Sequence, residues 1–249
     1  MATAELARDP LAPRSRRRPL RYFFVGMAGL AVVILLLAFV PEYRKFATGT
    51  FPIAGVLHVH AMIMGAWVAG YVFQAYLGAT ARSALHRRVG PFVVAIGAIA
   101  WVSMIFVEFR AVIAHPLPND ASAYDWNLPG PLVYLTFPIY LAWAVRERRR
   151  PAWHKRLMTF ALFLPLLAAI QRYLWIPIDY GYGPVAAVLD LSLLVPLAAY
   201  DLYTLKGRLH PATIRATFLL IGSQALLFML WGTALWRGFA LTIAQAIHG

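Results

Sequence analysis

Seven long apolar stretches follow one another along this chain, and they constrain its fold more than any other feature. A helix needs about 20 apolar residues to cross the hydrocarbon core of a bilayer, where only helices and closed barrels satisfy their backbone hydrogen bonds. The sequence therefore predicts an all-α, polytopic membrane protein with seven transmembrane helices. We expect these helices near residues 21–40, 53–77, 91–114, 129–145, 157–178, 183–205 and 212–236.

Composition supports this class. Of the 249 residues, 61% are apolar and only 13% are charged, whereas soluble domains carry roughly 25% charged residues. The chain has no cysteine, which excludes disulfides, thiolate metal sites and cysteine nucleophiles. The net charge of +13 on so apolar a chain indicates membrane topology, so we expect no nucleic-acid partner.

The basic residues predict the orientation of the chain. With the N-terminus inside, eighteen of the 23 Lys and Arg residues lie on the inner side of the predicted helices, as the positive-inside rule requires. We therefore expect an N-inside, C-outside protein of the bacterial inner membrane. It would comprise a basic, disordered cytoplasmic tail (1–20), a seven-helix domain (21–236) and a short outer segment (237–249).

Ionisable residues form a layer in the outer half of the predicted bundle. Several lie six or seven residues from the outer helix ends, roughly 10 Å deep at 1.5 Å per residue. Such groups are costly in a bilayer and mark either a site or a structural ion pair. The layer is therefore either a proton, quinone or metal site or a packing device. Its members are His58, His60, Glu108, Arg110, Arg172 and Asp190.

The helix at 53–77 carries a polar and aromatic stripe on one face. Helical spacing aligns His60 with Met64, Trp67, Tyr71 and Gln74. His58 and Met62 lie on the opposite face, so the four His and Met residues of this segment cannot all reach one ion. A two-ligand copper fragment on His58 or His60 is one hypothesis, and ordinary helix packing is the other.

Three histidines beside basic residues open helices on the predicted cytoplasmic side. They occur in ALHRRVG, AWHKRLM and GRLHPATIR, and the first two segments echo each other at a spacing of 68 residues. Basic helix N-termini favour acidic lipid head groups, and convergence of the histidines on a metal or haem iron is the alternative. This cytoplasmic rim consists of His86, Arg87, Arg88, His154, Lys155, Arg156 and His210.

Several segments together resemble a family of uncharacterised bacterial multipass membrane proteins. The segments are LHVHAMIMGAWVAGYVFQ, LHRRVG, WHKRLM and YDLYTLKGRLHPAT, and the resemblance covers roughly residues 50–215. It implies a shared fold and no established activity. The positions that match the family pattern are His58, Trp67, Gln74, His86, Arg87, Gly90, His154, Arg156, Asp201 and His210.

Three functional classes stay open on the sequence. The first is a redox- or metal-linked membrane protein with a quinone, proton or metal site in its outer half, for which haem, copper or a quinone would be the cofactor. The second is a non-catalytic accessory or assembly subunit of a larger membrane complex, with other membrane subunits as partners and a rim that binds acidic lipids. The third is a small-molecule transporter. No hydrolase or nucleotide-binding motif occurs in the chain.

Overall fold

The described part of the chain is helical. The computed structural model describes residues 20–49, 55–114, 124–125, 129–166, 169 and 191–248, and these ranges contain helices and turns but no strand. The helices are α2 (Phe23–Ala47), α3 (Gly55–Ala79), α4 (Ser83–Ala114), α5 (Pro129–Arg146), α6 (Pro151–Phe163), α9 (Val195–Thr204), α10 (Pro211–Leu230) and α11 (Ala234–His248). Two short 3-10 turns follow α5 and α6, at Glu147–Arg149 and Leu164–Leu166. The predicted all-α class is confirmed for these residues.

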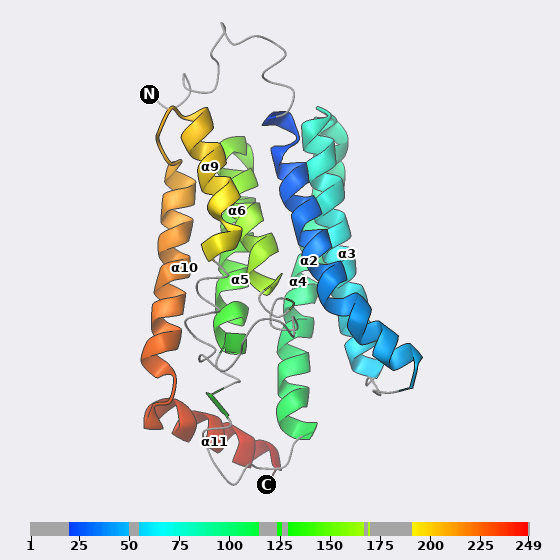
Figure 1. The fold of residues 1–249 in the computed structure, drawn as a ribbon, viewed down its shortest axis with the longest axis vertical. Coiled ribbons are helices and arrows are strands. Elements are labelled where there is room, and N and C mark those ends of the chain that lie inside the picture. Colours follow the sequence, from blue (N-terminus) through cyan, green and yellow to red (C-terminus); the bar gives the residue numbers. More distant parts are fainter. Residues whose placement is uncertain are drawn as a thin grey trace, which may run out of the picture.

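The long helices lie side by side in one bundle (Figure 1). α3 and α4 form one antiparallel hairpin, α5 and α6 form a second, and α2 and α10 pack against them. The centre of the bundle is filled by large side chains, among them Trp67, Phe137, Tyr140 and Leu157, which have no exposed surface. These residues come from α3, α5 and α6, so the two hairpins share one core.

The outer surface of the bundle is apolar as well. Large side chains such as Phe92 and Phe218, both 70% exposed, face outward from helix positions far from either end. Four helices are long and apolar enough to cross a membrane: Phe23–Ala47, Gly55–Ala79, Ser83–Arg110 and Pro211–Leu230. An apolar exterior around an apolar core is typical of an integral membrane protein.

The predicted helix boundaries hold in part. α2, α3, α4 and α5 overlap the first four predicted spans, but α4 begins at Ser83, eight residues before the predicted span. The last predicted span, 212–236, is too long: α10 ends at Leu230, and Gly232 adopts a positive φ of 74° in the turn that follows. A left-handed turn of this kind favours glycine and ends the helix.

Connections between helices meet at two opposite ends of the bundle. One end contains the start of α2, the α3–α4 and α5–α6 turns and the α9–α10 loop (Figure 1). We call it the basic end because eleven exposed Lys and Arg residues lie there: Arg21, Arg82, Arg87, Arg88, Arg146, Arg148, Arg149, Arg150, Lys206, Arg208 and Arg215.

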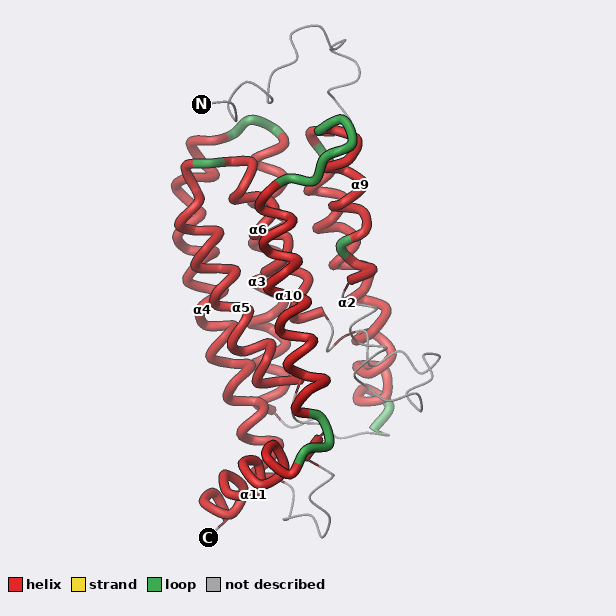
Figure 2. Tube along the Cα trace, turned by 90° about the vertical axis from the view of Figure 1, so that its left-hand side faces the viewer, coloured by secondary structure: helices red, strands yellow, loops and turns green. Residues whose placement is uncertain are grey.

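α11 crosses the other end of the bundle instead of continuing it (Figure 2). Its Trp236 donates a hydrogen bond from Nε1 to the Tyr124 carbonyl at 2.9 Å, and its Arg237 pairs with Asp125 at 2.6 Å. The residues that follow α10 therefore form a second helix, anchored to the bundle at this end.

Candidate functional site

Two histidines face each other at the basic end. His86 lies one turn into α4 and His154 one turn into α6, and their ring centres are 6.2 Å apart with an interplanar angle of 88°. Both rings are partly buried. The structure thus brings together two of the three rim histidines, from segments 68 residues apart in the chain.

The two helical hairpins hold these histidines in the same way. In the α3–α4 hairpin, Nδ1 of His86 lies 3.2 Å from the backbone carbonyl oxygen of Gln74. In the α5–α6 hairpin, Nδ1 of His154 lies 2.8 Å from that of Ala144. Each histidine therefore reaches across its own turn to the preceding helix, so the sequence echo corresponds to a repeated structural unit.

The contacts of His154 fix its tautomer. A carbonyl oxygen only accepts hydrogen bonds, so Nδ1 of His154 carries the hydrogen and donates it to Ala144. Burial lowers the pKa of His154, and the neighbouring His86 lowers it further, against the opposing effect of the Ala144 hydrogen bond. His154 is therefore a neutral imidazole with a free lone pair on Nε2.

Gln74 contacts the His86 ring through two groups, its backbone carbonyl and its side-chain amide. Its backbone carbonyl accepts from His86 when the hydrogen is on Nδ1. With its side-chain nitrogen turned toward His86, Gln74 comes within 2.6 Å of the same Nδ1, and its side-chain oxygen accepts from the Gly90 N–H at 3.0 Å. Both neutral tautomers of His86 thus find a partner in Gln74, and the first of them leaves Nε2 free.

A buried ion pair lies in the same region. Arg156 of α6 and Asp201 of α9 are 3% and 0% exposed, and the guanidinium donates to Asp201 Oδ1 through both Nε and an Nη atom. Asp201 Oδ2 also accepts from the Thr213 hydroxyl at 2.6 Å and from the His210 backbone N–H at 3.0 Å. The pair is fully hydrogen-bonded and joins α6, α9 and α10.

His210, the third rim histidine, serves a different purpose. Its Nδ1 accepts from the Ala212 N–H at 3.0 Å and so caps α10. The centre of its ring lies 5.7 Å from that of the Trp153 ring. The guanidinium groups of Arg150 and Arg215 lie over the same Trp153 ring, 4.9 and 5.4 Å from its centre. His210 is therefore a helix cap next to a cationic aromatic cluster and not a third member of the histidine pair.

The remaining rim residues differ in how exposed they are to the surface. Arg87 and Arg88 are exposed and suit a lipid-facing surface. Lys155 lies 3.3 Å from the Tyr200 hydroxyl, and burial followed by the charge of Arg156 lowers its pKa to about 8. Sequence reasoning grouped Arg156 with the surface cations and missed its partner Asp201, because the pairing depends on contacts across 45 residues.

The outer polar layer is only partly within the described residues. His60 lies 3.0 Å from the Ser103 hydroxyl, and Tyr134 donates to Glu108 at 2.9 Å. His58 faces α2, where its ring packs against Phe46 and Tyr43 at 4.8 and 5.6 Å. Arg110 is exposed, and Arg172 and Asp190 lie outside the described residues. His58 and His60 thus contact different helices.

The predicted stripe on α3 faces inward. Trp67, Tyr71 and Gln74 are buried, and Met64 packs against the same core. The Tyr71 hydroxyl lies 3.1 Å from that of Thr159 on α6. At Gly97 an added Cβ would lie 2.7 Å from the Trp67 ring, so this glycine allows α4 to approach the indole closely.

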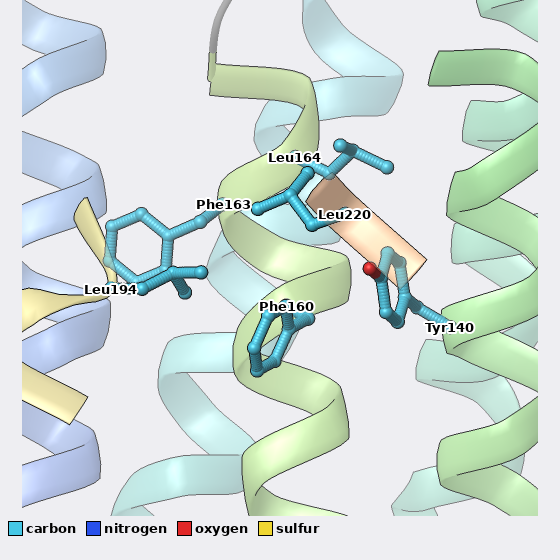
Figure 3. Close-up of a pocket in the computed structure, with 6 residues that line it drawn as sticks. All are labelled: Tyr140, Phe160, Phe163, Leu164, Leu194 and Leu220. Carbon is cyan, nitrogen blue, oxygen red and sulfur yellow. The ribbon is translucent and has the colours of Figure 1, made fainter. Parts of the chain in front are cut away.

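A small pocket between α5, α6, α9 and α10 is apolar (Figure 3). Its lining contains one side-chain polar atom, the Tyr140 hydroxyl, which donates to the Ala216 carbonyl at 2.8 Å. The other lining residues are Phe160, Phe163, Leu164, Leu194 and Leu220. This pocket suits hydrocarbon and offers no chemical group for catalysis.

Metal-binding side chains do not gather in larger groups within the described ranges: no cluster of three or more His, Asp or Glu residues occurs there. The histidine pair is therefore the arrangement with most chemical potential in this part of the chain. Comparisons with models of known protein families, with curated proteins and with solved structures found no match to this chain.

Proposed function

We propose that this chain is a metal-linked, multi-pass protein of the bacterial inner membrane, with one metal ion bound between His86 and His154. The proposal includes seven membrane-spanning helices with the N-terminus inside, which would put the histidine pair at the cytoplasmic end. Four helices of sufficient length and hydropathy support its membrane part, and the exposed cations of the basic end support its orientation.

The geometry of the histidine pair is the observation that carries the metal assignment. Two imidazole nitrogens on opposite sides of one ion, each about 2.0 Å from it, set the ring centres roughly 6 Å apart. The ring centres of His86 and His154 are separated by 6.2 Å in an edge-to-face contact, so binding would require the rings to turn until both Nε2 atoms point at the ion. Metal-bound histidines usually donate their other ring N–H to a carbonyl or carboxylate, and the Gln74 and Ala144 carbonyls are available for this role.

The outer polar layer is a second candidate site in the same functional class. Glu108 accepts a hydrogen bond from Tyr134, and His60 contacts Ser103. Hydrogen-bonded carboxylates and imidazoles inside a membrane are typical of proton pathways and quinone sites. In this second proposal Arg172 and Asp190 complete the layer.

The competing class is a non-catalytic accessory subunit. In that case the exposed Arg87 and Arg88 bind acidic lipid head groups or a partner subunit, and the histidine pair only packs the two hairpins together. This class predicts a protein that purifies without metal.

Elemental analysis of the detergent-purified protein tests the proposal. We expect about one iron, copper or zinc per chain in the wild type, and its loss in His86→Ala and His154→Ala. His58→Ala and His60→Ala serve as matched controls that should keep the metal. Trace metal in folded wild-type protein would favour the accessory class, and loss in the His58 or His60 variant would move the site to the outer half.

A further inference from the structure

We propose that the cationic aromatic cluster at the basic end, formed by Trp153, Arg150 and Arg215, binds the phosphate group of one anionic phospholipid. This inference goes beyond the proposed function and does not depend on a metal. Three observations support it: two guanidinium groups converge on one ring, most hydrogen-bond donors of the cluster are unused, and an exposed apolar surface adjoins the cluster.

Two arginines from different parts of the chain meet at one tryptophan. The guanidinium carbon of Arg150, just before α6, lies 4.9 Å from the centre of the Trp153 ring, and that of Arg215, on α10, lies 5.4 Å from the same centre. Both arginines are exposed, and Trp153 is half-buried. Cation–π attraction thus holds two like charges near one point. An anion bound to both guanidinium groups would remove their mutual repulsion.

Most hydrogen-bond donors of this cluster are unused. Arg150 donates through one Nη atom to Glu147 at 3.2 Å, and a guanidinium group has five N–H donors. Within the described ranges, Arg215 makes no ion pair or hydrogen bond, and the indole N–H of Trp153 donates to no acceptor. A phosphate group would supply the missing acceptors, because its oxygen atoms match the forked geometry of guanidinium donors.

Exposed apolar side chains adjoin the cluster on the side toward the middle of the bundle. α5 and α10 pack against each other, and Trp143 of α5 lies beside Trp153, with ring centres 6.2 Å apart. One helical turn further from the basic end, Ile139 of α5 is 48% exposed and Phe218 of α10 is 70% exposed. A free phosphate ion would gain nothing from this surface, whereas the acyl chains of a lipid would cover it. We therefore assign the phosphate to a phospholipid, at the membrane interface that tryptophan favours.

The lipid site is separate from the histidine pair. His154 follows Trp153 directly in the chain, but its ring contacts His86 of the other hairpin. The Trp153 ring contacts His210 at the start of α10 instead. Substitutions of the two arginines therefore test the lipid site without changing either histidine of the pair.

Native mass spectrometry of the detergent-purified, full-length protein tests the inference, with phosphatidylglycerol and zwitterionic phosphatidylcholine titrated separately. We expect one phosphatidylglycerol to bind more tightly than phosphatidylcholine. Because hydrogen bonds between charged groups are among the strongest in proteins, Arg150→Gln combined with Arg215→Gln should weaken this binding by at least about tenfold. The control, Lys206→Gln combined with Arg208→Gln, removes the same charge from exposed positions at the same end. It should weaken binding by less than about threefold, because screening limits the effect of distant charges.

Three results would overturn the inference. Equal losses of affinity in the two double variants would show that net charge alone attracts the lipid. Glycerol phosphate, the soluble counterpart of the head group, binding as tightly as phosphatidylglycerol would exclude a lipid as the specific occupant. Wild-type protein that is folded, as judged by circular dichroism, yet does not prefer the anionic lipid would overturn the site without any variant. None of these results depends on metal content, so the inference is tested separately from the proposed function.

Discussion

Asp201 has no exposed surface. Its carboxylate accepts hydrogen bonds from the Arg156 guanidinium of α6, from the Thr213 hydroxyl of α10 and from the His210 backbone N–H just before α10. Removing the cation would leave this charge buried and uncompensated, which typically costs 3–5 kcal/mol. We therefore expect Arg156→Met, which keeps most of the side-chain volume, to lower the free energy of unfolding by about 4 kcal/mol. Denaturation by sodium dodecyl sulfate in mixed micelles, followed by circular dichroism, measures this change.

The control is an exposed ion pair within one helix. Lys45 pairs with Glu42 at 2.8 Å within α2, and its side chain is 44% exposed. Lys45→Met should change the free energy of unfolding by less than about 1 kcal/mol. Equal effects of the two substitutions would contradict a structural role for the buried pair.

The residues around Asp201 show which properties of single residues the sequence predicts and which it does not. The LHRRVG, WHKRLM and YDLYTLKGRLHPAT segments could be selected as special from the sequence, and the positions of His86 and His154 at helix starts could be predicted. The exposure of each residue could not be predicted from the sequence. Lys155 and Arg156 are neighbours in sequence and both reach α9, but Arg156 is buried against the Asp201 carboxylate, whereas Lys155 is partly buried beside the Tyr200 hydroxyl.

At the scale of the element, α10 depends on an uncharged histidine at its N-cap. Only a neutral His210 can accept a hydrogen bond from the Ala212 N–H at its Nδ1. Burial lowers the pKa of His210 from 6.5 to about 4, and the charge of Arg156 adds to this effect. Lys155 and Arg150 also lower the pKa, and Asp201 raises it.

This low pKa makes the stability of the bundle dependent on pH. The contribution of the neutral cap is fully present above pH 6.5 and is lost as the pH falls toward 4, because the unfolded chain binds the proton first. We expect His210→Asn, which keeps a good N-cap without a titrating group, to have a flatter dependence of Tm on pH between 7 and 4. Identical slopes for the variant and the wild type would contradict this role.

Helix boundaries follow local rules where the sequence supplies a clear signal. Pro129 and Pro211 stand at the first positions of α5 and α10, as proline favours. The break between α10 and α11 lies in a mostly apolar run, where Gly232 ends α10 and the Thr233 hydroxyl accepts from the Trp236 N–H at 3.2 Å and so caps α11. Hydropathy alone therefore extends the last predicted span past the true helix end, because it measures composition and not backbone conformation.

At the scale of the whole molecule, the charges are divided between the two ends. Eleven exposed cations lie at the basic end. The other end has Arg44, Lys45 and Arg110 exposed, and its Arg237 is paired with Asp125. The sequence predicts this asymmetry directly, since it requires only the order of apolar and basic segments. It leaves convergence of the rim histidines open as one alternative, because their pairing depends on how the two hairpins pack against each other.

Labelling of introduced cysteines tests the orientation. The chain has no cysteine of its own, so each single variant reports one position. Thr48 and Arg149 are exposed and lie in turns at opposite ends of the bundle. Because cytoplasmic loops are enriched in Lys and Arg, we expect a membrane-impermeant maleimide to label Thr48→Cys in intact cells with a permeabilised outer membrane. Arg149→Cys should react only after the inner membrane is opened.

The reverse labelling pattern would place the basic end outside, and with it the histidine pair. The distinction matters for the histidine pair, because a cytoplasmic site meets a reducing compartment. Labelling of both variants in intact cells would contradict a membrane-spanning bundle altogether.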